Sequence, residues 1–443
     1  MQSTKLSILL LCCALLCSLA SVVVAQKKDK SNPAIPDPPP ATPYSNVKRD
    51  NLLNGLQIVT LDRQSDSTVK CDLIIRGGAM FDLVGKTGMA ALTQESLMIV
   101  NPRVKEELES LNAKIDWGVT WDTTWFHVEA PANNFGQSLE IVARLLVVEN
   151  IRPDAFKKAR EAQTAKVKTT KLTVAEQADA AFLKAIYGEH PYGHNLEGDD
   201  KSLAGINQGD AYDFFRRFYI ANNASAVVTG NISQERVMQV FKVLFGGWIK
   251  GQIVPATFRQ PMQTARLKLV KVPLPDAAMA ELRGGLIGVK HSDADFFVTQ
   301  AIACVLTNRL SRESGIGFSI KSEPRILSGP LYFSASATSD QAQDFSRRAT
   351  EAFASLTSAP VSELELVAAK SALVGDYSAR PIEQNLRDIE MFLLPRNLPV
   401  EIGKKIEAIS AADIQRVAKR LLDANALTVV VVGKINDSFK TGL

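Results

Sequence analysis

The feature that most constrains the fold of this 443-residue chain is an internal repeat. Residues 206–232 align without a gap on residues 409–435, which lie 203 positions later. In each copy a cap candidate, Asn207 or Ser410, opens a helical pattern. A run of β-branched residues follows and closes at a glycine that is free to take positive φ. A repeat with so long a period predicts two similar domains.

Each half of the chain mixes strand patterns with amphipathic helical patterns. The expected strands are 55–59 and 71–76 in the first half, and 267–272 and 282–289 in the second. The expected helices are 141–146 and 178–186, then 297–306 and 342–356. Because strands and helices do not alternate regularly as in βαβ units, the pattern predicts α+β lobes with largely antiparallel sheets.

The N-terminus predicts export. Lys5 precedes an almost unbroken apolar run at residues 6–25, which is typical of a secretory signal peptide. The run is long enough to cross a bilayer, so a retained membrane anchor is the alternative. An exported chain of this kind is periplasmic or secreted. The predicted organisation is a signal peptide (1–25), a proline-rich tether (26–47), a first lobe (48–248), an interdomain linker (249–263) and a second lobe (264–443).

Cysteine usage adds little to this picture. After removal of the signal peptide only Cys71 and Cys304 remain, one in each half. A single bridge would not be a disulfide framework. We therefore expect two buried free thiols.

Several classes of function are excluded by missing motifs. No Gly-x-Ser-x-Gly elbow and no phosphate-binding glycine motif occurs. A net charge of +4 is too small to indicate a nucleic-acid partner. His190 and His194 have a metal-binding spacing, but Pro191 and Gly193 between them favour a structural loop. The basic run at 157–171 is expected to be a solvated helix face, with contact to an acidic peptide or a partner as the alternative.

Four segments carry a family resemblance through their order and spacing. They are Asn54–Val59, Gly77–Ala79 with Gly85–Ala90, His190–Gly193 with Gly198, and Arg312-Glu313 with Gly315 and Gly317–Ser319. Together they resemble the pitrilysin, insulin-degrading-enzyme and mitochondrial-processing-peptidase family over residues 48–436. The resemblance implies two α+β lobes that face each other like a clam around a chamber.

The resemblance also locates a degenerate metal motif. In active members the helix after the glycine turn carries His-x-x-Glu-His, whose imidazoles bind zinc and whose Glu activates water. Registering on Gly88-Met89-Ala90 places these three positions at Ala91, Gln94 and Glu95. Ala91 has no ligand atom, Gln94 cannot act as a base, and Glu95 alone makes no zinc site. We therefore expect no catalytic residue, no metal and no cofactor in this chain.

Other family positions are matched less well. The third zinc ligand of active members comes from a later helix, here near 156–171, where Glu161 is the only acid and cannot be assigned as a ligand. In the second lobe, an Arg and a Tyr of the family hold the substrate backbone. Arg312 matches the Arg with a spacing one residue short, and Phe318 replaces the Tyr and lacks its hydroxyl.

Three hypotheses about function follow from the resemblance. The first is an exported non-catalytic homologue that pairs with a subunit carrying His-x-x-Glu-His and its zinc, so that the pair encloses a chamber for peptide or unfolded polypeptide. The second is an active metallopeptidase with a divergent ligand set. The third is a stand-alone peptide-binding or chaperone-like protein. In each case the N-terminal segment is a candidate membrane tether.

Overall fold

The computed structural model describes residues 44–99, 104–147, 151–255, 260–263, 267–311, 316–422, 426–436 and 439. The predicted signal peptide and most of the tether lie outside these ranges. All the described residues belong to one compact unit, Pro43–Leu443. Within the described residues, no helix combines the length and the apolar character that a bilayer span requires.

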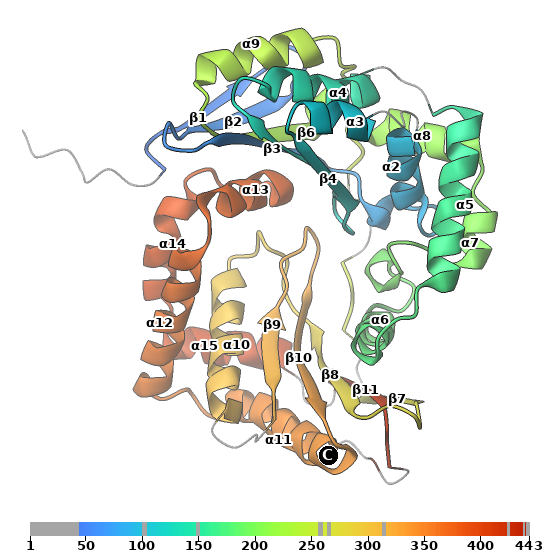
Figure 1. Ribbon diagram of the computed structural model, residues 1–443. Coiled ribbons are helices and arrows are strands. Elements are labelled where there is room, and N and C mark those ends of the chain that lie inside the picture. The colour runs from blue at the N-terminus through green and yellow to red at the C-terminus, as the bar shows by residue number, and fades with distance from the viewer. Residues whose placement is uncertain are drawn as a thin grey trace, which may run out of the picture. The chain divides into compact units, whose positions relative to one another are not determined.

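Two sheets with matching strand order organise the molecule (Figure 1). The first runs β1-β2-β6-β3-β5-β4 and the second β7-β11-β8-β10-β9. Apart from β1, the two orders correspond strand for strand, and each sheet has one parallel pair, β2–β6 or β7–β11. The predicted two homologous α+β lobes with largely antiparallel sheets are confirmed. The strands are β1 Val47–Asn51, β2 Gln57–Asp62, β3 Thr68–Ile75, β4 Lys114–Val119, β5 Thr124–Pro131, β6 Ala224–Gly230, β7 Lys268–Pro273, β8 Ala280–Ile287, β9 Phe318–Ser322, β10 Pro330–Ala337 and β11 Thr428–Gly433.

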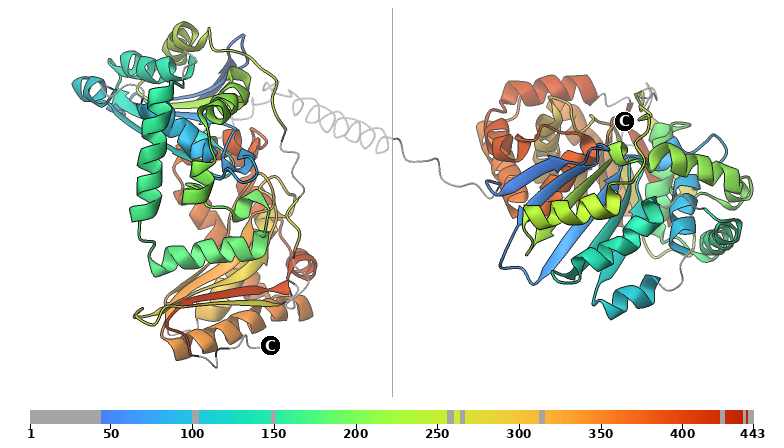
Figure 2. Two further views of the ribbon diagram at one scale, coloured as in Figure 1. Left: turned by 90° about the vertical axis from the view of Figure 1, so that its right-hand side faces the viewer. Right: turned by 90° about the horizontal axis from the view of Figure 1, so that it is seen from above.

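Helices flank both sheets, and each predicted helix is present but longer than its pattern indicated. Figures 1 and 2 show α4 and α9 over one face of the first sheet. The helices are α2 Met89–Ile99, α3 Val104–Ser110, α4 Phe135–Val147, α5 Pro153–Thr169, α6 Val174–Tyr187, α7 Asp200–Ala204, α8 Gln208–Phe218, α9 Gln234–Phe245, α10 Phe296–Ser311, α11 Ser339–Ser358, α12 Glu363–Ala379, α13 Ile382–Phe392, α14 Leu398–Glu407 and α15 Ala411–Leu421, with short 3-10 helices η1 Ala79–Phe81, η2 Pro191–Gly193 and η3 Ala221–Asn223.

The sequence repeat corresponds to a structural repeat. Asn207 and Ser410 cap α8 and α15, and each side chain accepts a hydrogen bond from the third helical amide, at 3.0 and 3.1 Å. Each helix leads into a central buried strand, β6 or β11. These strands end at Gly230 and Gly433, whose φ angles are 128° and 124°. The glycines are required there because a Cβ atom would lie within 2.3 Å of a carbonyl oxygen on the neighbouring strand.

Each lobe contributes one helix that covers the sheet of the other lobe. The second-lobe helix α13 packs on β3 and β6, and the first-lobe helix α6 packs on β8 and β11 (Figure 2). An ion pair lies at each of these two contacts, and the positive residue is on the helix in one and on the sheet in the other. Arg387 of α13 lies 3.4 Å from Asp72 on the first sheet, whereas Asp179 of α6 lies 2.5 Å from Arg283 on the second. Asp72 and Arg283 occupy equivalent positions, opposite matching valines of β6 and β11.

Cys71 and Cys304, the two cysteines of the described residues, are both free. Cys71 is buried in β3, and burial raises the pKa of its thiol well above the usual range. Cys304 on α10 is only half-buried, which differs from the predicted full burial, and desolvation raises the pKa of its thiol to about 11. Neither thiol has the low pKa of a reactive cysteine.

Candidate functional site

The helix that carries the degenerate motif, α2, begins on a buried carboxylate. Asp82 accepts hydrogen bonds from the amides of Gly88 at 2.7 Å and Ala90 at 2.8 Å. Burial raises the pKa of this carboxyl to about 7, although the backbone donors oppose the shift. Sequence reasoning missed this cap, because Asp82 lies six residues before the glycine whose amide it holds.

Two glycines bring the motif helix against the loop that follows the His-Pro-Tyr-Gly segment. Gly88 and Gly198 have φ angles of 88° and 74°. A Cβ atom on Gly88 would lie 2.6 Å from the carbonyl oxygen of Glu197, and one on Gly198 would lie 2.3 Å from that of Thr87. The two segments singled out in the sequence therefore touch through their backbones.

The three motif positions line a cavity of about 260 Å³ between α2, β4 and α5. Gln94 is buried, and its side-chain amide donates a 2.9 Å hydrogen bond to the carbonyl of Trp125. Glu95 is half-buried and accepts a 3.3 Å hydrogen bond from the indole of Trp117. Ala91 contributes only a methyl group. The position that carries the catalytic Glu in active relatives thus ties α2 to β5.

The opposite wall, on α5, also offers no ligand set. Gln163 is buried and donates to the carbonyls of Gly88 at 3.3 Å and Glu197 at 2.8 Å. Lys166 lines the same cavity and pairs with the Glu197 carboxylate at 2.9 Å. Glu161 is exposed and lies 4.0 Å from Lys157 on its own helix. Among the described residues, no three His, Cys, Asp or Glu side chains are grouped so that they could hold a metal ion.

The basic run along α5 is largely paired. Besides Lys157 and Lys166, Lys168 contacts Asp200 at 2.8 Å, and Arg160 donates to the carbonyl of Ile206 at 3.0 Å. These lysines are more than half exposed. The observed pairing agrees with the expected solvated helix face.

The His-Pro-Tyr-Gly segment forms the 3-10 turn η2, and the predicted structural loop is present. The amide of Tyr192 donates to Nδ1 of His190 at 3.2 Å. The buried Tyr192 hydroxyl donates to Asp122 at 2.5 Å and accepts from the amide of Leu327 at 3.1 Å. Burial raises the pKa of Asp122, while the Tyr192 hydroxyl lowers it. This loop therefore links the two lobes rather than forming a metal site.

A buried arginine from the second lobe fills the aromatic pocket of that loop. The Arg325 guanidinium lies 4.0 Å from the ring centroid of Trp121 and 4.7 Å from that of Tyr192. Its side chain is 4% exposed and also contacts Glu323 at 3.3 Å. Nothing in the sequence connects Arg325 with residues more than 100 positions earlier, so sequence reasoning missed this contact.

The structure describes only one of the two predicted substrate-binding residues. Arg312 lies outside the described residues. Phe318 is on β9, opposite Ala335, and its ring packs 5.3 Å from that of Phe345 on α11. Phe318 thus faces the second-lobe core, and its contact with substrate stays a prediction.

An apolar hollow of about 1170 Å³ adjoins the motif cavity, and the two share Glu95 and Trp117. Strand β4 forms one wall and lies at the edge of the first sheet, where among the described strands it pairs only with β5. Met98, Ile99 and Leu108 supply apolar surface. An open strand edge beside an apolar hollow is suited to binding an extended peptide.

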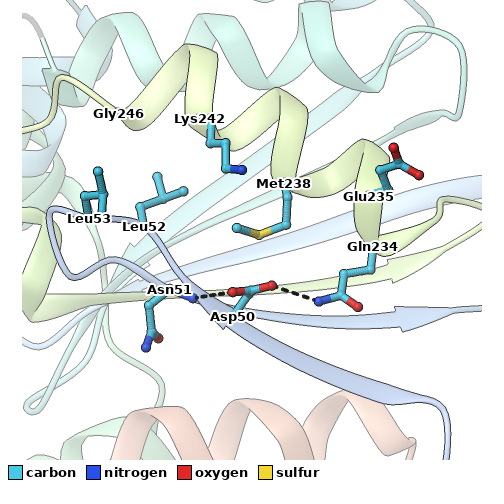
Figure 3. A pocket seen from close by; sticks show the side chains of 9 residues that line it. All are labelled: Asp50, Asn51, Leu52, Leu53, Gln234, Glu235, Met238, Lys242 and Gly246. Carbon is cyan, nitrogen blue, oxygen red and sulfur yellow. Dashed lines mark hydrogen bonds between the residues drawn. The ribbon is translucent and has the colours of Figure 1, made fainter.

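A separate hollow of about 700 Å³ lies between the β1–β2 turn and α9 (Figure 3). There Asp50 accepts hydrogen bonds from the amide of Asn51 at 3.2 Å and the side chain of Gln234 at 3.0 Å. None of the motif residues lines this hollow, so it is not part of the candidate site.

The fold and the site together define a class: a two-lobed α+β scaffold that resembles zinc peptidases, with no ligand set at the positions Ala91, Gln94 and Glu95. Residues 205–373 match the family model described as "Peptidase M16 inactive domain". An uncharacterized zinc protease from Rickettsia bellii is 18% identical over 411 residues, covering 87% of this chain and 97% of that protein.

Solved structures show the same fold. A peptidase M16 inactive domain from Pseudomonas fluorescens superposes with a TM-score of 0.78 at 17% identity, covering 88% of this chain and 98% of that one. The periplasmic protease PqqL from Escherichia coli gives 0.75 at 16% identity, covering 90% of this chain but only 48% of that one. The chain is thus similar to M16 peptidases in sequence and in fold, and the resemblance to the pitrilysin and processing-peptidase family is confirmed.

Proposed function

We propose that this chain is an exported, non-catalytic M16 homologue that pairs with a zinc-bearing homologous subunit and contributes one part of a peptide-binding chamber. The observation that carries the proposal is the cavity at Ala91, Gln94 and Glu95. The matched inactive-domain segment begins at residue 205, so the proposed lack of catalysis rests on these three residues and not on the name of that segment.

The side chains of this cavity do not fit a catalytic zinc ion. Such an ion needs three protein ligands and an open fourth position. Only Glu95 offers a ligand atom among the motif positions, and Gln94 is committed to a backbone carbonyl. Glu197 also lines the cavity, but its carboxylate is paired with the ammonium group of Lys166 at 2.9 Å. We therefore assign the zinc to the partner subunit and derive no hydrolytic step in this chain.

The peptide-binding part of the proposal is supported by the edge strand β4. A peptide strand added to β4 would satisfy backbone groups at the open edge, and its alternate side chains would enter the apolar hollow. Trp117, which is 38% exposed, stands where this hollow meets the motif cavity. The mixed charge of Lys114, Asp116 and Lys158 around the rim gives no preference for a peptide of one charge.

Pairing and export are supported by PqqL. That protein is about twice the length of the part that this chain matches, so it has room for a second unit of similar size. In the proposed pair, a separate subunit supplies the part that corresponds to the other half of PqqL. PqqL is described as periplasmic, which agrees with the export signal predicted at residues 1–25.

The test is purification of the tagged chain from its own host, followed by mass measurement, zinc analysis and a peptide-cleavage assay with a chelator control. We expect a complex of about twice the chain mass, with one zinc per two chains and cleavage that the chelator abolishes. Glu95→Gln should leave zinc content and cleavage unchanged, whereas substitution of the two motif histidines in the partner should abolish both.

Two other outcomes would replace this proposal. About one zinc per chain in the isolated protein, lost in Glu95→Gln together with cleavage, would identify a divergent metallopeptidase. Peptide binding by a chain that copurifies with no homologue would identify a stand-alone peptide-binding or chaperone-like protein.

A further inference from the structure

The outer face of α12 is apolar and uncharged although it is exposed. Leu364, Val367 and Val374 are 71%, 50% and 42% exposed. The complete face, called the α12 face below, follows helical spacing and consists of Leu364, Val367, Ala368, Ser371, Val374, Gly375 and Ser378, all of them exposed. An apolar face on a surface helix indicates that another molecule covers it.

The duplicated lobe provides an internal comparison. Helix α5 occupies the matching place in the first lobe. It has the same length, 17 residues, and begins 210 positions earlier. The inward positions correspond, since Phe156 and Ala159 are buried as are Leu366 and Ala369. The outward positions of α5 that match the α12 face are Asp154, Lys157, Lys158, Glu161, Thr164, Ala165 and Lys168, five of them charged.

The loss of charge on the outer face of α12 is informative because α5 and α12 occupy equivalent places in the two lobes. A solvated outer helix face needs charge, and α5 provides it, with Lys157–Glu161 and Lys168–Asp200 contacts. On α12 every one of those charges is replaced by an apolar or small side chain. Fold requirements alone do not explain the replacement, since the α5 face meets them with charged residues.

The α12 face is complementary to itself. When two copies are placed antiparallel about a twofold axis at Ser371, position i of one helix faces position 742 − i of the other. Leu364 then faces Ser378, Val367 faces Gly375, and Ala368 faces Val374, so each larger side chain meets a smaller one. Isologous contacts require such a self-complementary patch. Lys370, beside the face, is turned away by its 2.7 Å hydrogen bond to the carbonyl of Glu407.

We propose that two copies of this chain associate through the α12 face, with the two α12 helices antiparallel about Ser371. The inference goes beyond the proposed pairing with a zinc-bearing subunit, because it uses a surface on the second lobe that contains none of the motif residues. The contact is small, since a helix of 17 residues is about 25 Å long. It therefore belongs to the weak class of interfaces.

Sedimentation velocity of the purified chain between about 1 and 200 µM tests the proposal. We expect concentration-dependent formation of a dimer. Val367→Lys introduces the residue that α5 carries at the same place, and it should weaken association at least tenfold. Val243→Lys changes an exposed valine on α9, 82% exposed, and should have no effect.

Cysteine cross-linking gives a readout that does not depend on loss of binding. Ser371→Cys should form a disulfide-linked dimer under mild oxidation, because Ser371 faces its own copy at the twofold axis. Glu161→Cys is the matched control on α5 and contains the same native cysteines. A monomer at 200 µM without cross-linking above this control, or association that Val367→Lys leaves intact, would overturn the proposal.

Discussion

The link between the lobes through Tyr192 makes a prediction whose size follows from the structure. Tyr192→Phe removes two hydrogen bonds at a buried site, one to the Asp122 carboxylate and one from the Leu327 amide. A hydrogen bond to a charged group contributes about 1.5–3 kcal/mol, and an unsatisfied buried amide costs about 1–3 kcal/mol. We expect the free energy of unfolding to fall by about 3–5 kcal/mol.

Urea unfolding measures this loss, and Tyr187→Phe is the matched control. Tyr187 is also buried and also crosses to the second lobe, but its hydroxyl makes a single neutral hydrogen bond, to the carbonyl of Ser328 at 2.9 Å. That variant should lose about 1 kcal/mol. The dependence of the free energy on urea should stay the same, which attributes the shift in midpoint to stability.

The pH dependence of stability distinguishes the hydrogen bond from Tyr192 to the Asp122 carboxylate from the neutral hydrogen bond of Tyr187. The Tyr192 hydroxyl lowers the pKa of Asp122, whose burial raises it. Without the hydroxyl, the folded-state pKa of Asp122 rises further above its unfolded value. The folded variant then holds this proton up to higher pH, so its stability falls more steeply than that of the wild type as pH rises. Equal losses for Tyr192→Phe and Tyr187→Phe, at pH 5 and pH 8 alike, would refute the reasoning.

Three further predictions test separate parts of the fold. Burial lowers the pKa of His291 to about 4, so at this residue the unfolded chain binds more protons than the folded chain between pH 6.5 and 4. In urea unfolding, the stability of the wild type relative to His291→Phe should fall by about 3 kcal/mol as the pH decreases over that range. Gly198→Ala should lower the thermal midpoint through a cost of about 3 kcal/mol, because φ is 74° and the new Cβ meets a carbonyl oxygen, whereas Gly403→Ala in open space on α14 should stabilise by about 0.5–1 kcal/mol. Arg283→Met removes the partner of the half-exposed Asp179 and also of the Glu281 carboxylate, which is 16% exposed; the unpaired Glu281 charge should cost about 3 kcal/mol in denaturant unfolding.

The parts of the fold that the sequence predicted are those with local signals. The helix that begins at Asn207 and the one that begins at Ser410 each carry a side chain three residues before the amide that it caps. The strands that follow them are continuous β-branched runs, which read as buried from a few residues alone. The degenerate motif was equally local, since Gly88 fixes the register of Ala91, Gln94 and Glu95 on one helix.

The parts that could not be predicted depend on pairs far apart in the chain. Asp72 reads as an acid in a strand until α13 brings Arg387 to it, 315 positions later. Lys166 reads as one lysine of a basic run, and only the fold places it in the motif cavity. The side to which Phe318 points depends on the pairing of β9 with β10, which no local pattern specifies.

The exchange of α6 and α13 between the lobes has a consequence for how the chain acquires its structure. Strand β6, the last of the first sheet, ends at Gly230, but the helix that covers this sheet begins at Ile382, about 150 residues later. Val59, Leu61 and Val227 stay in contact with solvent until then, although they belong to the same apolar cluster as Leu386 and Ile389. We therefore expect the first lobe to be prone to aggregation during synthesis until α13 packs on its sheet.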